Sequence, residues 1–334
     1  WVTIQIGCDN SCAFCIVPAV RGKEISRPYS ELVSEVEQLA LTGVTEITLL
    51  GQNVNSYGRD LTLKLRGAEL TPESIQLVGE KWVEGPRTAR PLFSDLLCSV
   101  AAVSGIRRVR YTSPHPKDFR PETIAAMAQI PEVCEHLHLP LQSGSDKILA
   151  AMHRGYTADR YIQKVTAARD EIPDLALSTD IIVGFPGETD LDFERTLEVA
   201  AEVKFDNAYT FVYSPRPGTE AAESSEQVVE AKTSADRMER LRKVIQRTSL
   251  KGNESRVGRE EEIIVEGHSK RDKKMLTGRT RHNRLVHFPA DRVIRPGSYA
   301  QVRVVEARTF NLVGELVEVT AGAKHRTRIP VVSS

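Results

Sequence analysis

An alternation of strand and helix patterns over the first two thirds of the chain constrains the fold more than any other feature. Six runs rich in Val, Ile, Leu and Thr have the length of buried strands, and helical patterns separate them. The runs cover residues 2–6, 46–50, 107–112, 136–139, 175–183 and 208–213. Because parallel neighbours need crossover helices, six βα units predict a wholly or partly closed (βα)6 barrel. An open, doubly wound sheet is the alternative, and both folds place ligands at the carboxyl ends of the strands.

The last third of the chain follows a different pattern. One long charged helical pattern at 225–249 precedes five short strand-like runs. These runs cover residues 261–266, 275–280, 285–288, 300–306 and 312–319. They predict a small antiparallel, OB-like barrel, a fold that often binds nucleic acid. We therefore divide the chain into residues 1–224 with a mobile insertion near 61–90, a linker helix at 225–250 and a β-barrel at 251–334.

A balanced net charge hides an asymmetry. The chain has 45 Lys and Arg against 45 Asp and Glu, but residues 251–334 hold 17 basic and only 10 acidic side chains. The basic run, as we call it, consists of Lys270, Arg271, Lys273, Lys274, Arg279, Arg281 and Arg284. It predicts a polyanionic partner, most simply nucleic acid, although a solvated surface fits the same charges. No secretory leader and no apolar run of ~18 residues is visible, so we expect a cytoplasmic protein that does not contact membranes.

Three cysteines stand together directly after the first predicted strand. Cys8, Cys12 and Cys15 form a C-x3-C-x2-C run. A disulfide framework does not suit this spacing, and structural zinc needs a fourth ligand. The other cysteines, Cys98 and Cys134, fit buried positions on a helix and before a strand. Three thiolates favour a four-iron cluster with one open iron over zinc, and an open iron can bind a cofactor or substrate.

Longer strings extend the cysteine pattern. They are Gly-Cys-Asp-Asn-Ser-Cys-Ala-Phe-Cys-Ile-Val-Pro at 7–18, Gly-Gln-Asn-Val-Asn-Ser-Tyr-Gly at 51–58, Leu-Pro-Leu-Gln-Ser-Gly-Ser at 139–145 and Asp-Ile-Ile-Val-Gly-Phe-Pro-Gly-Glu-Thr at 180–189. With the (βα)6 pattern, the first string resembles the radical S-adenosylmethionine (radical SAM) superfamily. All four strings resemble its methylthiotransferase branch, and the string at 51–58 is similar to bacterial tRNA 2-methylthio-N6-dimethylallyladenosine synthases. The resemblance covers nearly the whole chain and includes a terminal TRAM domain.

The resemblance implies a partial (βα)6 radical SAM barrel followed by a TRAM barrel. It implies that Cys8, Cys12 and Cys15 hold a [4Fe-4S] cluster, whose open iron binds SAM and cleaves it reductively. The implied activity is a transferase that adds a 2-methylthio group to N6-dimethylallyladenosine at tRNA position 37. The implied partners are the tRNA anticodon arm, an electron donor and a sulfur source, and the protein would be a monomer. The basic run would hold the anticodon arm through its phosphates.

Polar and aromatic side chains at the strand ends are the further site candidates. Those assigned to cofactor binding are Phe14, Gln52, Asn53, Asn55, Gln142, Ser143, Asp180 and Gly184. Phe14 offers an aromatic face to adenine, and the polar groups suit SAM or the target base. Turn formation or packing is the alternative role for each residue taken singly.

Histidines and arginines near these strings have open roles. His136 and His138 point to the same side of one strand, either into the site or as a core pair. His115 is a loop candidate. Arg21 and Arg27 are candidates to pair with the SAM carboxylate, with RNA phosphate or with acidic neighbours. No catalytic residue is assigned.

The resemblance also indicates a missing part. Complete members of the branch carry an N-terminal domain with three further cysteines for a second cluster, whereas this sequence begins at Trp1. We therefore expect a fragment that binds one cluster and SAM without completing methylthiolation. The alternatives are a zinc-bound, non-catalytic RNA-binding protein and a methylthiotransferase acting on a ribosomal protein. The string at 51–58 argues against the ribosomal substrate.

Overall fold

Six parallel strands form the first part of the fold in the computed structural model, which describes residues 1–270 and 272–324. They are β1 (Val2–Thr3), β4 (Glu46–Leu50), β5 (Arg108–Tyr111), β6 (His136–His138), β7 (Ala176–Val183) and β8 (Asn207–Val212). β1, β4 and β5 form one sheet and β6, β7 and β8 another, and a bridge between Val109 and Val133 joins them. Within the described residues, β1 and β8 pair on one side only. The predicted partial barrel is thus confirmed, and the sequential strand order excludes the doubly wound alternative.

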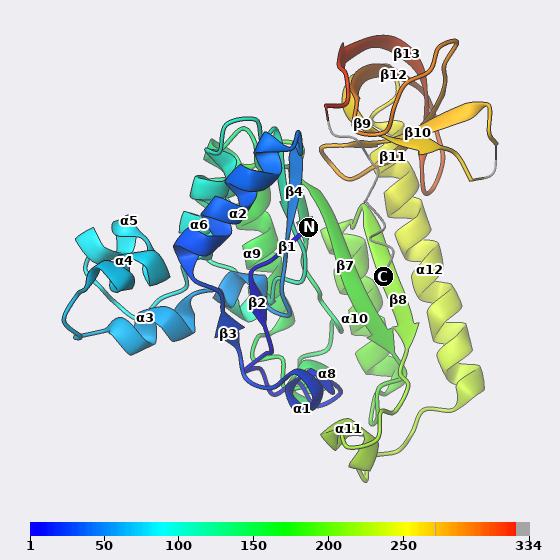
Figure 1. Ribbon diagram of the computed structural model, residues 1–334. Coiled ribbons are helices and arrows are strands. Elements are labelled where there is room, and N and C mark those ends of the chain that lie inside the picture. Colours follow the sequence, from blue (N-terminus) through cyan, green and yellow to red (C-terminus); the bar gives the residue numbers. More distant parts are fainter. Residues whose placement is uncertain (271, 325–334) are drawn as a thin grey trace, which may run out of the picture.

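Five helices cover the outer face of these strands (Figure 1). They are α2 (Tyr29–Leu41), α6 (Phe93–Ala101), α7 (Pro121–Gln129), α9 (Ala158–Glu171) and α10 (Asp190–Val203). Thr157 and Thr189 begin α9 and α10, because each side chain accepts a hydrogen bond from an N–H of the first turn. The helices leave the carboxyl ends of the strands free for loops.

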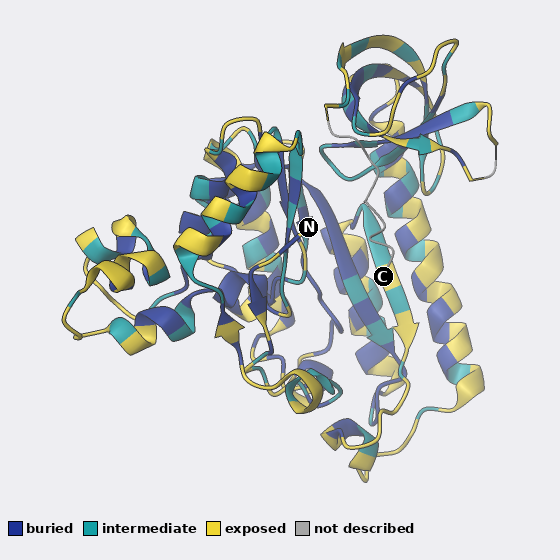
Figure 2. Ribbon diagram, in the orientation of Figure 1, coloured by how far each residue is buried: buried dark blue, intermediate teal, exposed yellow. Residues whose placement is uncertain are grey.

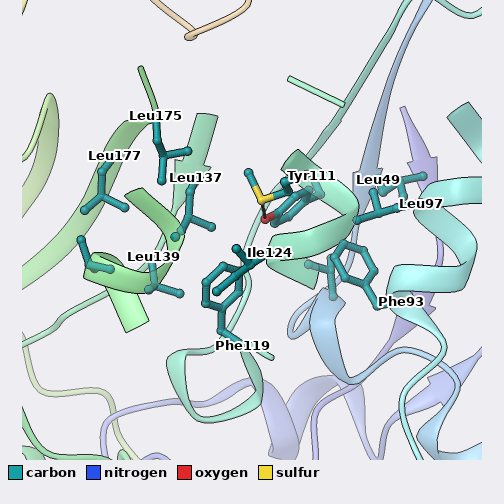
Figure 3. Close-up of a cluster of buried hydrophobic side chains, with 14 of the residues drawn as sticks. Leu49, Phe93, Leu97, Tyr111, Phe119, Ile124, Leu137, Leu139, Leu175 and Leu177 are labelled. Carbon is teal, nitrogen blue, oxygen red and sulfur yellow. Dashed lines mark hydrogen bonds between the residues drawn. The ribbon is translucent and has the colours of Figure 1, made fainter. Parts of the chain in front are cut away.

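Apolar side chains fill the space between strands and helices. Figure 3 shows Leu49 and Tyr111 of the strands beside Phe93 and Leu97 of α6. The rings of Phe93 and Tyr111 meet edge to face with centroids 5.0 Å apart. The buried Tyr111 hydroxyl donates to Met127 Sδ at 2.8 Å, so its polar group is satisfied. Full burial of such side chains stabilises the fold by roughly 1.5–3 kcal/mol each.

Short elements shape the loops at the carboxyl ends of the strands. They are β2 (Gln5–Ile6), α1 (Val17–Arg21), β3 (Ile25–Ser26), η1 (Val54–Ser56), η2 (Pro116–Asp118), α8 (Asp146–Ala151) and α11 (Glu220–Glu223). β2 and β3 pair antiparallel and close the cysteine loop at its base.

The predicted insertion is helical. It contains α3 (Arg59–Leu65), α4 (Pro72–Val78) and α5 (Glu80–Glu84). Val78 and Trp82 are buried in the main core, and the Trp82 indole donates to the Thr88 carbonyl at 2.9 Å. These contacts attach the segment to the barrel, which the sequence patterns did not indicate.

A long helix leads to a second barrel. α12 (Ala231–Glu254) is buried along one side and exposed along the other (Figure 2). The barrel contains β9 (Glu260–His268), β10 (Met275–Thr280), β11 (Leu285–Pro289), β12 (Tyr299–Ala307) and β13 (Leu312–Ala321). It closes in the order β10-β11-β13-β12-β9 around its own apolar core. The predicted small barrel is confirmed, with one correction: β11 and β13 pair parallel, whereas the other pairs are antiparallel.

The second barrel sits at the amino ends of the parallel strands. Arg108 is fully buried there and donates to the carbonyls of Glu262 and Arg279 at 2.8 and 2.9 Å. Arg110 donates to the Thr280 carbonyl at 2.7 Å. The loops that carry α1, α8 and α11 lie at the opposite end (Figure 1). Among the described residues, no helix is long and apolar enough to cross a membrane.

Candidate active site

The cysteine loop leaves β2 through a glycine that no other residue can replace without strain. Gly7 has φ of +75°, and a Cβ there would meet the Lys23 carbonyl oxygen at 2.0 Å. The Cys8 N–H donates to the Gly22 carbonyl at 3.2 Å, and the Glu24 N–H donates to Asp9 Oδ1 at 3.0 Å. Pairing of β2 with β3 therefore folds residues 8–23 into one closed loop with the three cysteines half-buried on it.

A cavity of about 340 Å³ opens beside this loop. Its walls come from the loops after β2, β4, β5 and β6 and from Asp180 of β7, so it lies at the carboxyl ends of the parallel strands. All three cysteines line it. The position of the cavity agrees with the sequence-based prediction that ligands bind at the carboxyl ends of the strands.

Four of the eight predicted cofactor-binding residues line this cavity. They are Phe14, Gln52, Gln142 and Asp180. Gln142 is held at φ of +68° because its N–H donates to the Asp180 carbonyl and its own carbonyl accepts from Ile182, at 2.8 and 2.9 Å. Its buried Oε1 has no partner within the described part of the chain. Such an orphaned acceptor suits a bound molecule that supplies a donor.

Asn53 and Asn55 do not line this cavity. The Asn53 amide donates to Asp118 Oδ2 at 2.8 Å. Asn55 holds the backbone of His115 on both sides, donating to its carbonyl at 2.9 Å and accepting from its N–H at 2.8 Å. These asparagines join the loops after β4 and β5, and their contact with the cofactor stays a prediction.

Ser143 and Gly184 also lie outside the cavity lining. Ser143 is fully buried, with its Oγ 3.3 Å from Thr196 Oγ1. Gly184 has φ of +74°, and a Cβ there would meet Ser234 Oγ at 2.4 Å. Its small size therefore serves the packing of α12, and its predicted role in cofactor binding stays a prediction.

The three histidines differ in their surroundings. His138 lines the cavity, with Nδ1 3.0 Å from Ser178 Oγ and Nε2 3.4 Å from Asp180 Oδ2. His136 contacts the same Ser178 hydroxyl through Nε2 at 3.1 Å. His115 accepts from the Lys117 N–H at Nδ1, and burial, together with nearby Arg154, lowers its pKa to about 3. His115 is therefore neutral at physiological pH, and its buried Nε2 has no partner among the described residues.

The buried cation of the cavity is one that the sequence reasoning missed. Arg154 is 5% exposed, and its Nη1 donates to Cys12 Sγ at 3.2 Å. Arg27 instead forms ion pairs with Glu31 and Glu35, and Arg21 is an exposed residue of α1. No spacing or periodicity marks Arg154, because only the folded loop between α8 and α9 brings it to the cysteines.

Two further cavities continue the first along the open side of the barrel. One of about 450 Å³ shares His138 and Asp180 with it and reaches Asn283 of the second barrel. Another of about 290 Å³ shares Gln142 and Asp180 and reaches Phe211. Tyr209 and Phe211 of the edge strand β8 are about half exposed, at 53% and 52%. A hollow with aromatic walls thus runs from the cysteine loop towards the second barrel.

The basic run divides into two groups. Lys270, Lys273 and Lys274 are exposed, and Arg271 lies outside the described residues. Arg279 pairs with Glu266, Arg281 with Glu135 of the parallel barrel and Arg284 with Asp206. Arg281 and Arg284 therefore connect the two barrels, and their role as phosphate ligands stays a prediction.

Comparison with known proteins decides the family. The sequence profile of the radical SAM superfamily matches residues 2–200, and that of the TRAM domain matches residues 254–317. The chain belongs to the radical SAM superfamily. Members of this superfamily use a [4Fe-4S] cluster together with SAM.

Curated relatives of this radical SAM chain share a name. This chain is 46% identical over 318 residues to the tRNA-2-methylthio-N(6)-dimethylallyladenosine synthase of Moorella thermoacetica. The match covers 95% of this chain and 65% of that protein. The chain is 45% identical over 321 residues to tRNA-2-methylthio-N(6)-dimethylallyladenosine synthase 1 of Mycobacterium marinum, covering 94% and 58%. The chain thus spans less than two thirds of the length of these relatives. A solved structure, coproporphyrinogen III oxidase from Escherichia coli, is 12% identical with a TM-score of 0.46, covering 90% of this chain and 65% of that one.

The radical SAM cofactors fit the donors present. Three thiols on one loop and the unpartnered Gln142 Oε1 face the same cavity. Cys98 lines a separate pocket with Lys81, and Cys134 is buried before β6. Neither lines the cavity as a fourth thiol, which a closed zinc site made of four cysteines would need. No three His, Cys, Asp or Glu side chains of the described ranges are gathered in ligand geometry.

Proposed function

We propose that this chain carries the radical SAM and RNA-binding parts of an enzyme that adds a 2-methylthio group to N6-dimethylallyladenosine at tRNA position 37. The observation that carries the proposal is a pair of adjoining cavities that share His138 and Asp180 and together reach from the cysteine loop to the TRAM barrel. The similarity to the two synthases over nearly the whole chain supports it. We further propose the division into residues 1–224, 225–250 and 251–334.

In this proposal Cys8, Cys12 and Cys15 hold the [4Fe-4S] cluster. The cluster and SAM supply radical chemistry when bound, while the protein orients the reactants and excludes water. Phe14 contacts Phe185 edge to face with centroids 6.4 Å apart, which gives the cavity an apolar wall. Gln142 offers its free acceptor to the donors of SAM.

The substrate base would enter from the open side of the barrel. Ser178 and Asp180 fix the His138 ring from both of its nitrogens, so this ring presents a defined edge to a base. Tyr209 lies beside His138 with ring centroids 6.0 Å apart and is 53% exposed. Base stacking on such aromatic rings contributes roughly 1–3 kcal/mol per base.

The rest of the RNA would lie against the TRAM barrel. The exposed lysines of the basic run suit phosphate contacts, which position the arm without reading its sequence. An adenine must leave the anticodon loop to reach the cysteines at the far end of the barrel. We also propose a cytoplasmic monomer that depends on an electron donor and a sulfur source.

Anaerobic reconstitution with iron and sulfide tests this function. We expect the dithionite-reduced chain to give a four-iron EPR signal that changes when SAM is added. The matched control is a Cys98→Ala variant, which should keep this signal, whereas Cys12→Ala should lose it. Bound zinc without iron, or a cluster indifferent to SAM, would instead favour a non-catalytic RNA-binding protein.

A further inference from the structure

The loop between α8 and α9 is attached to the cysteine loop at three points. The Ala13 N–H donates to the Met152 carbonyl at 3.2 Å, and His153 Nδ1 lies 3.1 Å from the Ser11 carbonyl oxygen. The third contact is the bond from Arg154 to Cys12 Sγ. His153 and Gly155 have φ of +55° and +70°, and this turn directs the arginine between them into the cavity.

Arg154 carries a buried charge that no carboxylate of residues 1–270 and 272–324 pairs with. Within the part of the chain that the structure describes, its polar contacts are Cys12 Sγ and the Tyr156 hydroxyl, each at 3.2 Å. A buried charge is costly unless an opposite charge compensates it. Tyr156 is itself fixed, because its hydroxyl lies 2.9 Å from the Leu141 carbonyl oxygen. The guanidinium is therefore held rigidly against one sulfur atom.

We propose that Arg154 raises the reduction potential of the cluster by donating a hydrogen bond to the Cys12 sulfur. This inference rests on the proposed cluster site at Cys8, Cys12 and Cys15. Reduction adds one negative charge to the cluster, and a nearby cation in a poorly solvated site stabilises that charge. Hydrogen bonds to the sulfur atoms are among the features that set the potential of iron–sulfur clusters. Arg154 thus makes the cluster easier to reduce before SAM binds.

The test is a redox titration of the reconstituted full chain, followed by EPR without SAM. For Arg154→Gln we expect the equilibrium constant for reduction to fall at least tenfold, which is about 59 mV for a one-electron couple. Lys117→Gln is the matched control, since this exposed lysine contacts Asn10 of the same loop at 3.3 Å but no cysteine. It should shift the potential far less.

Two results would overturn the inference. In the first, the cluster of the Arg154→Gln variant has the same reduction potential as the cluster of the Lys117→Gln variant. In the second, Arg154→Gln weakens SAM binding at an unchanged SAM-free potential, which would assign the arginine to the cofactor carboxylate. If Arg154→Gln loads no cluster, the Tyr156→Phe variant is measured in its place. This variant releases the Arg154 guanidinium from the Tyr156 hydroxyl but keeps its charge. A lowered reduction potential then supports the proposal, and an unchanged reduction potential rejects it. A wild-type chain without any four-iron cluster would remove the proposed function as well.

Discussion

At the scale of single residues, a comparison of two glycines of the cysteine loop distinguishes the effect of backbone conformation on stability from the effect of packing. Gly7 and Gly22 both have φ of +75°, but only at Gly7 would a Cβ overlap backbone atoms, since nothing lies within 4 Å of a Cβ at Gly22. We expect Gly22→Ala to lower the free energy of unfolding by about 1–3 kcal/mol, because its φ of 75° and ψ of −165° lie in a region that is essentially restricted to glycine. Gly7→Ala should cost more than about 3 kcal/mol and reduce cluster loading. Urea unfolding and iron analysis measure both, and equal losses in the two variants would contradict this account.

At the scale of elements, a buried carboxyl joins β3 to η1. The Ser56 hydroxyl donates to Glu24 Oε2 at 2.5 Å, and burial raises the pKa of Glu24 to about 7. Because the folded pKa lies above the ordinary value of 4.5, the folded state binds more protons than the unfolded state between these values. Stability from this group is therefore complete below about pH 4.5 and is lost as the pH rises to about 7. In Glu24→Gln the unfolding free energy should fall less over this window than in wild type, whereas exposed Glu37→Gln should follow wild type.

Elements also show how far sequence patterns reach. Apolar periodicity predicted the strands and helices of both barrels, and the close spacing of Cys8, Cys12 and Cys15 predicted their shared site. Packing of α4 and α5 through Trp82 was missed, because a buried tryptophan in a polar segment has no periodic signal. Arg154 was missed for the same reason: its partner is 142 positions away in the sequence. Local patterns report which face is buried, whereas pairing between distant loops depends on the finished fold.

At the scale of the whole molecule, two cations of the basic run should give opposite phenotypes. Arg281 donates to Glu135 and to the Pro131 and Val133 carbonyls, at 2.6 to 3.0 Å. Arg281→Gln should therefore cost roughly 2 kcal/mol of unfolding free energy, as expected for hydrogen bonds from a charged donor. Lys273 is exposed, so Lys273→Gln should leave stability unchanged. It should instead weaken binding of an anticodon-arm RNA and lower the slope of log affinity against log salt by about 1.

The two readouts together distinguish a connection between the barrels from a phosphate contact. Urea unfolding measures the first, and RNA titration at several salt concentrations measures the second. If Lys273→Gln left the salt slope unchanged, the phosphate contacts would have to lie elsewhere on the TRAM barrel. If Arg281→Gln lowered the salt slope without loss of stability, its ion pair with Glu135 would open when RNA binds. The connection between the barrels would then itself be part of RNA recognition, because the guanidinium would exchange the Glu135 carboxylate for a phosphate.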